Sequence, residues 1–196
     1  IEGWYRDRKR VLDFYNARRA QLATVSPNLA HTILHELEED YDVCIVTQNV
    51  DNLHERAGST NIIHLHGELT KVRPVDTYTD EDFWSERYVQ DIGYRAIHLG
   101  DCGGPHNTQL RPHIVWFGEA VPNLQKAADA VMRADVLLII GTSMQVYPAA
   151  GLYRYASSDC RIFMIDPDEA AAAHVRGITH IKEVATAGMQ KFREML

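Results

Sequence analysis

Two short polar stretches of the chain carry residues suited to proton transfer and to holding a polar ligand. In VTQNVDNLHERAG, an apolar run is followed directly by Gln48, Asn49 and Asp51. In NIIHLHGEL, another apolar run ends on His66, and Gly67 follows. An imidazole can act as a general base near neutral pH, and Gly allows the backbone to turn sharply after it. We therefore expect these amide, acid and base groups to share one crevice.

Each of these residues also has a structural explanation. A lone His at a strand end is more often satisfied inside the fold than catalytic, and Asp51 could simply cap the short helix NLHERAG. His64 shares the face of His66 because side chains alternate along a strand, but it lies deeper. We expect His64 and His54 to be structural, whereas the clustering around His66 favours a functional site.

Two further strand ends carry groups suited to a nucleotide. The run IIGTS ends in Gly141, Thr142 and Ser143, small residues whose amides and hydroxyls suit a ribose or a phosphate. The run MIDP ends the next strand on Asp166, and an acid in this place commonly binds ribose hydroxyls. Each signal alone is common at strand–turn–helix joints, but together they indicate a nucleotide.

Short apolar runs alternate with helical patterns along much of the chain. The runs are VCIVTQN, NIIHLHG, HIVWFGE, VLLIIGTS, RIFMIDP and THIKEVA, and the helical patterns are VPNLQKAADAVMRAD, PAAGLYRYASS and AGMQKFREML. Continuous apolar runs suit strands covered on both faces, and the alternation predicts an α/β fold with a parallel, doubly wound sheet. A ligand of such a sheet binds at the carboxyl ends of its strands, where the polar residues stand.

Two helical patterns precede the first of these runs. The first is RDRKRVLDFYNARRAQL. The second begins with Ser26, which we expect to cap it, and Pro27, which suits the first helical position. Its expected buried stripe is Leu29, Ile33 and Leu37.

The segment 70–111 breaks the alternation. It is polar, loop-like and rich in Gly and aromatic residues. We therefore predict a Rossmann-like domain made of residues 20–69 and 112–196, and a small helical and loop module made of residues 1–19 and 70–111.

The composition excludes several classes of protein. With 196 residues, of which 45% are apolar, the chain is globular, and its formal net charge of -7 argues against nucleic-acid binding. Three widely spaced cysteines imply no disulfide framework, and no apolar run reaches the length of a membrane span. The charged start IEGWYRDRKR is no signal peptide. These features predict a cytoplasmic protein without a membrane segment.

Five stretches in register resemble the sirtuins, the NAD-dependent protein deacylases. They are TQNVDNLHERAG, HLHGEL, RPHIVWFGE, GTSMQVYPAAG and the strand-end ID, and PNLAHTILHELE fits as well. The resemblance implies that NAD is a consumed co-substrate and that the partners are acyl-lysine peptides or proteins. It also implies nicotinamide and O-acyl-ADP-ribose as products.

The resemblance further implies roles for individual residues. His66 matches the catalytic base, which acts on a ribose hydroxyl, and Asn49 and Asp51 match residues that hold nicotinamide and its ribose. Asp166 stands where Asn is more usual, so it can accept hydrogen bonds but not donate them. The matching contacts are Gln48, Asn49, Asp51, Gly141, Thr142, Ser143, Asp166 and Ala185 for NAD, and Val115, Phe117, Gly118 and Val146 for a peptide bound by strand addition.

The chain departs from the family pattern in two places. Family members begin with a strand and a Gly-rich loop that the printed chain does not show, and we expect an upstream segment to supply them. Most sirtuins bind zinc through two Cys pairs, but here only Cys102 remains, and His98 and His106 bring the candidates to three of the four ligands needed. We expect no zinc, and a module held by aromatic packing through Phe83, Trp84, Tyr88 and Tyr94.

The stretch FYNARR carries a signal for the acyl group. Tyr15 and Arg18 lie three residues apart on one helical face and resemble the Tyr-x-x-Arg pair of sirtuins that prefer acidic acyl groups. A guanidinium fork binds both carboxylate oxygens, and a phenol adds a donor. We predict removal of succinyl or malonyl groups, and also of acetyl groups. The competing explanation is that Arg18 is one more solvated charge.

Two other functions stay open at this point. One is a mono-ADP-ribosyltransferase or NAD glycohydrolase using the same pocket, against which Tyr15 and Arg18 argue. The other is a non-catalytic nucleotide-binding module, against which the cluster around His66 argues. The sequence contains no signal for an oligomeric state.

Overall fold

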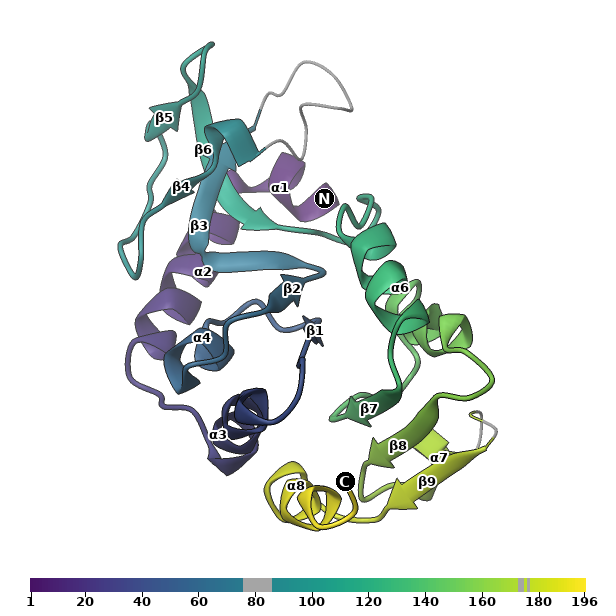
Figure 1. Cartoon of the computed structure of the whole chain (residues 1–196). Helices are drawn as coiled ribbons and strands as arrows, with labels where there is room; N and C mark the ends of the chain where they lie inside the picture. The colour runs from purple at the N-terminus through teal and green to yellow at the C-terminus, as the bar shows by residue number, and fades with distance from the viewer. Residues whose placement is uncertain (76–85, 173–174, 176) are drawn as a thin grey trace. The chain divides into compact units, whose positions relative to one another are not determined.

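The computed structural model describes residues 1–75, 86–172, 175 and 177–196 (Figure 1). It divides into two compact units, each described by itself below. Unit 1 comprises Ile1–Ser26, Thr47–Asn52 and His64–Pro122, and unit 2 comprises Pro27–Val46, Leu53–Ile63 and Asn123–Leu196. Unit 1 contains the described part of the predicted small module and extends beyond it. The predicted domain bounds stay a prediction.

Unit 1 is built on a four-stranded antiparallel sheet, so the loop-like prediction for 70–111 is wrong where these residues form its strands. The strand order is β4-β3-β6-β5, and the long central pair β3 and β6 runs antiparallel with an irregularity between Glu68 and Val72. The strands are β3 (Gly67–Pro74), β4 (Gln90–Asp91), β5 (Cys102–Gly103) and β6 (Thr108–Ile114), with a short η2 (Glu86–Tyr88).

The run HIVWFGE does not form the parallel strand that its apolar character predicts. Its first two residues end β6, and the chain then leaves the sheet for a turn. Val115 to Glu119 therefore connect the antiparallel sheet to the next segment, and their side chains are not constrained by strand alternation.

Two helices pack on this sheet. They are α1 (Glu2–Arg6) and α2 (Arg8–Leu22), and α2 lies along β3 (Figure 1). An apolar cluster joins helices and sheet through Trp4, Leu12, Val72, Ile92, Ile97 and Leu110. Burial of large apolar side chains is the main favourable term here, at about 1.5–3 kcal/mol for each one fully buried.

Unit 2 confirms the alternation of strands and helices. Its parallel sheet has the order β7-β8-β9, with β7 Val136 opposite β8 Arg161 and β8 Ile162 opposite β9 Ile178. The elements are α3 (Leu29–Glu36), η1 (Leu37–Glu39), α4 (Leu53–Ala57), α6 (Leu124–Met132), β7 (Val136–Ile140), η3 (Ala149–Tyr155), β8 (Arg161–Ile165), α7 (Glu169–Ala172), β9 (Ile178–Ile181) and α8 (Ala185–Arg193).

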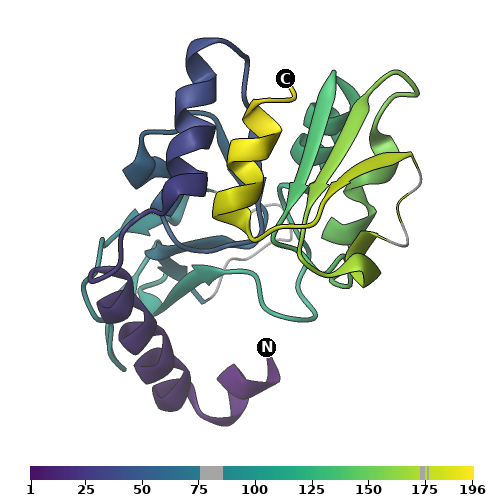
Figure 2. The ribbon, with the colours of Figure 1, turned by 90° about the horizontal axis from the view of Figure 1, so that it is seen from below.

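The core of unit 2 lies where α3 and α8 meet the parallel strands (Figure 2). Gly188 allows this close approach, because a Cβ there would lie 2.3 Å from Ile165 Cγ2. The core residues are Ala30, Ile33, Leu37, Phe163, Ile165, Ile181, Met189 and Phe192.

The start of α3 differs from the prediction in its capping residue. Asn28, not Ser26, is the N-cap: its Oδ1 accepts hydrogen bonds from the N–H groups of Ala30 and His31. The His31 ring in turn accepts from the Asn28 N–H, which completes a capping box. Leu29, the first helical residue, is 43% exposed and does not belong to the buried stripe.

A separate two-stranded sheet pairs β1 (Ile45–Thr47) with β2 (Ile62–His64). In unit 2 the Ile45 N–H donates to Asn61 O, and in unit 1 the Leu65 N–H donates to Thr47 O. These strands lead into the polar stretches 48–52 and 65–66. None of the helices within the described residues combines the length and apolarity needed to span a bilayer.

Candidate active site

His66 lies in a two-residue bend between β2 and β3, so the prediction that it ends a strand is wrong by two residues. Its ring is half-buried, with Nδ1 3.1 Å from the carbonyl oxygen of Gln48. A carbonyl oxygen can only accept a hydrogen bond, so Nδ1 carries a hydrogen in this contact. The neutral ring then keeps its lone pair on Nε2, which is the arrangement that a general base needs.

Gly67 fixes the backbone directly after this histidine. Its φ of 79° lies in the left-handed region, and a Cβ there would lie 2.1 Å from the carbonyl oxygen of His113 on β6. Any side chain would therefore have to push β3 away from β6. The close pairing of the two strands thus determines where the His66 backbone turns.

The loop after β1 holds the predicted nicotinamide contacts. The N–H of Asn49 donates to Thr47 Oγ1 over 3.1 Å, and the carbonyl of Val50 accepts from the N–H of Leu69 on β3 over 2.7 Å. Asn49 is exposed and Asp51 is half-buried. Together with the Gln48–His66 contact, these bonds bring the loop and the His66 bend side by side within unit 1, as the sequence predicts.

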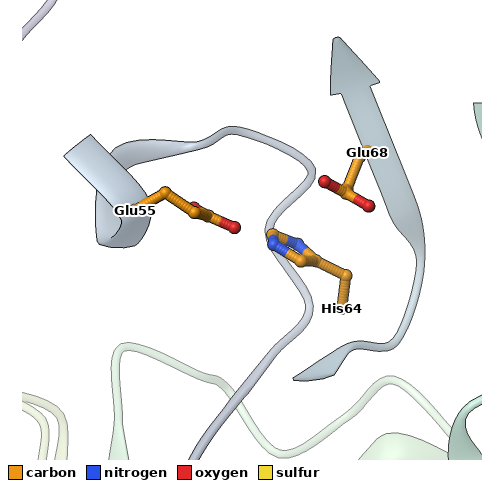
Figure 3. Close-up of side chains that lie close together, drawn as sticks. All are labelled: Glu55, His64 and Glu68. Atoms are coloured by element: carbon orange, nitrogen blue, oxygen red, sulfur yellow. The ribbon is translucent and has the colours of Figure 1, made fainter. Parts of the chain in front are cut away.

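His64 is held inside the fold, as expected of a structural histidine. It is 8% exposed, and its Nδ1 lies 3.3 Å from the carbonyl oxygen of Asn49. Figure 3 shows the His64 ring and the Glu68 carboxylate, both of unit 1, turned toward one another, with a ring nitrogen and a carboxylate oxygen within 4.8 Å. Glu68 also forms an ion pair with Lys71 at 2.6 Å. Glu55, labelled in the same figure, belongs to unit 2.

The predicted peptide-binding segment is tied to the backbone of His66. The N–H of Val115 donates to His66 O over 2.9 Å. Two residues on, Phe117 is 90% exposed, and Gly118 has a left-handed φ of 91°. An aromatic ring this exposed, two residues after the bond to His66, is suited to contact a bound peptide.

A buried ion pair, which no pattern in the sequence indicates, fixes the turn that follows this segment. Arg111 Nη1 and Nη2 donate to the two carboxylate oxygens of Glu119 at 2.6 and 3.0 Å, and both side chains are 3% exposed. Glu119 also accepts from the N–H of Trp116 at 2.8 Å, and the Arg111 guanidinium lies 3.4 Å from the Trp116 ring centroid. Burial raises the pKa of Glu119, but Arg111 outweighs burial and lowers it overall.

The two residues predicted to choose the acyl group both lie on α2. Tyr15 is half-buried, and its Oη accepts a hydrogen bond from Trp116 Nε1 at 2.8 Å. Arg18 is exposed, and its Nη1 donates to Gln21 Oε1 at 3.3 Å. The guanidinium of Arg18 is thus accessible to an anion.

Arg19 is a further polar residue of this helix that the sequence analysis missed. It is 0% exposed; its Nε donates to Leu69 O over 2.7 Å, and its Nη1 donates to Asn16 Oδ1 over 2.9 Å. Burial lowers the pKa of Arg19 to about 10, so it stays charged at neutral pH. Because the Leu69 N–H donates to Val50, Arg19 links α2 to the strand that positions the 48–51 loop.

The remaining predicted NAD contacts lie in unit 2, at the carboxyl ends of its parallel strands. Gly141 follows β7 with a left-handed φ of 62°, and its N–H donates to Ile165 O on β8 at 3.4 Å. Asp166 follows β8, and its Oδ1 accepts from the Asp168 N–H at 2.8 Å. Thr142 Oγ1 accepts from the Met144 N–H at 3.3 Å. Parallel pairing therefore brings the ends of β7 and β8 to one edge.

Three other predicted residues surround this edge or follow it in the chain. Ser143 is exposed after β7, Val146 is 41% exposed in the same connection, and Ala185 begins α8 after β9. No atom lies within 4 Å of a Cβ built on Gly141, so the turn after β7 leaves open space. An open turn with hydroxyls and a nearby carboxylate is compatible with a ribose and a phosphate.

The predicted zinc-module position contains only exposed candidates. His98, Cys102 and His106 are all exposed, and within the described ranges none of them belongs to a group of three close metal ligands. The lack of zinc stays a prediction. Phe83 and Trp84 lie outside the described residues, and Tyr94 is 40% exposed, so it does not hold the module by burial.

Comparison with known proteins gives a consistent result. The model of the Sir2 family matches residues 1–148. An NAD-dependent protein deacylase of Bacteroides thetaiotaomicron is 45% identical over 197 residues, covering 100% of this chain and 82% of that protein. One of Helicobacter pylori is 49% identical over 191 residues, covering 96% and 78%.

Solved structures agree with the sequence comparison. A Sir2 homologue in complex with NAD has a TM-score of 0.84 at 33% identity, covering 99% of this chain and 74% of that one. Sir2 bound to an acetylated peptide has a TM-score of 0.78 at 25% identity, covering 100% and 81%. These neighbours confirm the predicted α/β fold class with Rossmann-like parallel strands.

Proposed function

This chain belongs to the Sir2 family, and from that membership we propose that it is an NAD-dependent protein-lysine deacylase. Relatives at 45% and 49% identity are named NAD-dependent protein deacylases. Solved neighbours bind NAD, an acetylated peptide and a propionylated peptide. The proposal assigns NAD as a co-substrate and acyl-lysine peptides as partners.

The observation that carries the proposal is the anchoring of His66. A ring held through Nδ1 by the Gln48 carbonyl presents Nε2 as a base of fixed orientation. In the proposed role, Nε2 takes a proton from a ribose hydroxyl. Asn49 and Asp51, on the loop that the same contact fixes, would hold the nicotinamide end, with Gln48 as a further ribose contact.

The adenosine end would be held by unit 2. Gly141, Thr142 and Ser143 offer an open turn with amide and hydroxyl groups, and Asp166 offers carboxylate oxygens to ribose hydroxyls. Ala185 would contact adenine through its backbone. When bound, NAD supplies the ADP-ribosyl group that takes over the acyl group, so nicotinamide and O-acyl-ADP-ribose leave as products.

In unit 1 the peptide would lie along Val115, Phe117 and Gly118. Val146, in unit 2, stays a predicted peptide contact. The exposure of Phe117 and the left-handed Gly118 support an extended partner here. The side chains would surround the acyl-lysine and keep water away, which favours attack by the weakly nucleophilic acyl oxygen.

For the acyl group we propose a preference for succinyl and malonyl over acetyl. Two features support it. Arg18 is exposed, so its guanidinium can receive a carboxylate, and Tyr15 is a neighbouring phenol on the same face of α2. The preference is a finer statement than family membership, because the relatives are named only as protein deacylases.

The test is a product analysis with one peptide in succinyl, malonyl and acetyl forms. The full-length protein, NAD and peptide are incubated, and nicotinamide, O-acyl-ADP-ribose and the deacylated peptide are measured by mass spectrometry. We expect all three in equal amounts, with the succinyl form fastest. Nicotinamide release without loss of the acyl group would instead identify an NAD glycohydrolase or an ADP-ribosyltransferase.

A further inference from the structure

The hydroxyl of Tyr15 already accepts one hydrogen bond within unit 1. Trp116 Nε1 donates to Tyr15 Oη over 2.8 Å, and the two rings lie 6.3 Å apart at an interplanar angle of 30°. An indole N–H can only donate, so the phenol oxygen must be the acceptor. Within the described part of the chain this hydroxyl makes no second hydrogen bond. Its own hydrogen is therefore left to donate to a group from outside.

The indole that makes this bond is itself clamped. The Arg111 guanidinium lies over its ring at 3.4 Å, and Glu119, paired with the same arginine, accepts the Trp116 backbone N–H at 2.8 Å. Both charged side chains are 3% exposed, so water does not compete for these contacts. The direction of the indole N–H is thus set by the buried ion pair.

We propose that Trp116 is a positioning residue for acyl selectivity, because its indole N–H directs the Tyr15 hydroxyl as a donor toward a terminal carboxylate on the acyl chain. This inference rests on the proposed function, and it adds Trp116 as the residue that orients the Tyr15 hydroxyl. An acetyl group has no carboxylate, so it gains nothing from a directed donor. Burial raises the pKa of Tyr15, which keeps the phenol protonated and able to donate at neutral pH.

Two matched substitutions separate this hydrogen bond from the packing of the rings. Trp116→Phe keeps an aromatic face for Arg111 but removes the N–H. Trp4→Phe is the control: Trp4 is 2% exposed, its ring lies 5.4 Å from that of Trp116, and its Nε1 has no hydrogen-bond partner within the described residues. Both variants lose an indole from the same cluster, but only one loses a hydrogen bond.

The experiment measures kcat/KM at saturating NAD and equilibrium Kd for succinyl and acetyl forms of one peptide. It uses the full-length protein, both single variants, Tyr15→Phe and the Tyr15→Phe/Trp116→Phe double variant. We expect Trp116→Phe to lower the succinyl-to-acetyl ratio by about 5- to 10-fold, the value of one hydrogen bond. Trp4→Phe should leave the ratio unchanged. In the Tyr15→Phe background, Trp116→Phe should lower the ratio no further.

Two results would overturn the inference. One is that Trp116→Phe lowers both activities by the same factor, as a packing defect would. The other is that it still lowers the ratio when Tyr15 is already Phe. If the unmodified protein turns over neither peptide, the proposed function is wrong, and the Kd ratios alone then decide the inference. Equal affinity of the unmodified protein for both peptides would also reject it.

Discussion

In unit 1 three arginines and two histidines are less than one-tenth exposed, whereas the core clusters of unit 2 consist of aliphatic, aromatic and Met side chains. Of the buried polar side chains within the described residues, Ser59 alone belongs to unit 2. The arginines and histidines of unit 1 are Arg19, Arg73, Arg111, His64 and His113. Arg19 and His64 contact backbone carbonyls, and Arg111 pairs with Glu119. Unit 1 thus adds buried directional bonds to its apolar cluster, whereas the clusters of unit 2 are apolar.

The residues that we propose to choose the acyl group lie in unit 1, among these buried polar contacts. The Arg111–Glu119 pair clamps Trp116, Trp116 bonds Tyr15, and Arg19 fastens the same helix to β3. A buried ion pair is weak evidence for stability by itself, but removing one partner leaves an uncompensated buried charge. Unit 1 should therefore be sensitive to loss of a single charge, and unit 2 should not.

The largest expected effect comes from breaking the buried pair of unit 1. Glu119→Gln keeps the shape but leaves Arg111 unpaired, and we expect a loss of about 3–5 kcal/mol in the free energy of unfolding. Glu36→Gln is the matched change in unit 2, where Glu36 pairs with Arg193 at 2.6 Å on the surface, and it should cost under ~1 kcal/mol. Denaturant titration of both variants gives the comparison. Equal losses in the free energy of unfolding would show that the buried ion pair of unit 1 stabilises the fold no more than the surface pair of unit 2.

The second effect concerns acyl choice. Arg18→Met keeps much of the side-chain volume but removes the charge, and we expect succinyl kcat/KM to fall by the equivalent of ~2–4 kcal/mol, with acetyl kcat/KM changed far less. The same assay on Lys182→Met, an exposed cation of unit 2, is the control. A parallel fall of both activities in Arg18→Met would mean that the helix is merely structural there.

A pH effect should also distinguish the two units. Burial, together with the nearby charges of Arg73, Lys71 and Arg111, lowers the pKa of His113 from its ordinary 6.5 to about 4. Between these two pH values His113 binds a proton in the unfolded chain but not in the folded chain. Its contribution to the free energy of unfolding is therefore complete above pH 6.5 and is lost as the pH falls toward about 4. The loss should reach at most ~3 kcal/mol.

The measurement is the free energy of unfolding between pH 7 and 4.5. His113→Gln should flatten its decline with falling pH, because glutamine does not titrate. His98→Gln, which changes an exposed ring, serves as the control. An unaltered decline in His113→Gln would remove this histidine from the acid sensitivity of unit 1.

The smallest effect is expected from metal removal. If buried charge and sheet pairing hold unit 1, purified protein should contain no stoichiometric zinc, and a chelator should leave the unfolding transition where it is. Elemental analysis and thermal melts with and without chelator measure this. One zinc per chain would show that the stretch from His98 to His106 acts as a metal site after all.

The comparison of the units also explains what the sequence could predict. The parallel strands of unit 2 are buried on both faces, so they read as unbroken apolar runs such as VLLII and RIFMI. The strands GELTKVRP and TQLRPHI of unit 1 carry buried arginines, a buried histidine and buried prolines among their apolar residues. No hydropathy pattern marks such strands, so the sequence predicts loops in their place.

The candidate site, like the fold, could be predicted from the sequence only in part. Gln48, Asn49 and His66 stand out as polar residues after apolar runs, and the structure brings them together within unit 1. Arg19 could have been found, because it occupies a position of the stripe Leu12, Tyr15 and Leu22, where a charge requires a buried partner. The Trp116–Tyr15 bond joins residues 101 positions apart, and no local pattern reveals it.

The central claim is that His66 is the base of an NAD-dependent deacylase, and one measurement tests it most directly. The rate of deacylation by His66→Ala is compared with that of the unmodified protein at saturating NAD and peptide, with folding of the variant checked by circular dichroism. Since the ring makes only one hydrogen bond within the described residues, to the Gln48 carbonyl, the variant should stay folded. The account predicts a loss of ~10²–10⁴ in rate, typical of a missing general base. Near-normal turnover in the folded variant would contradict it.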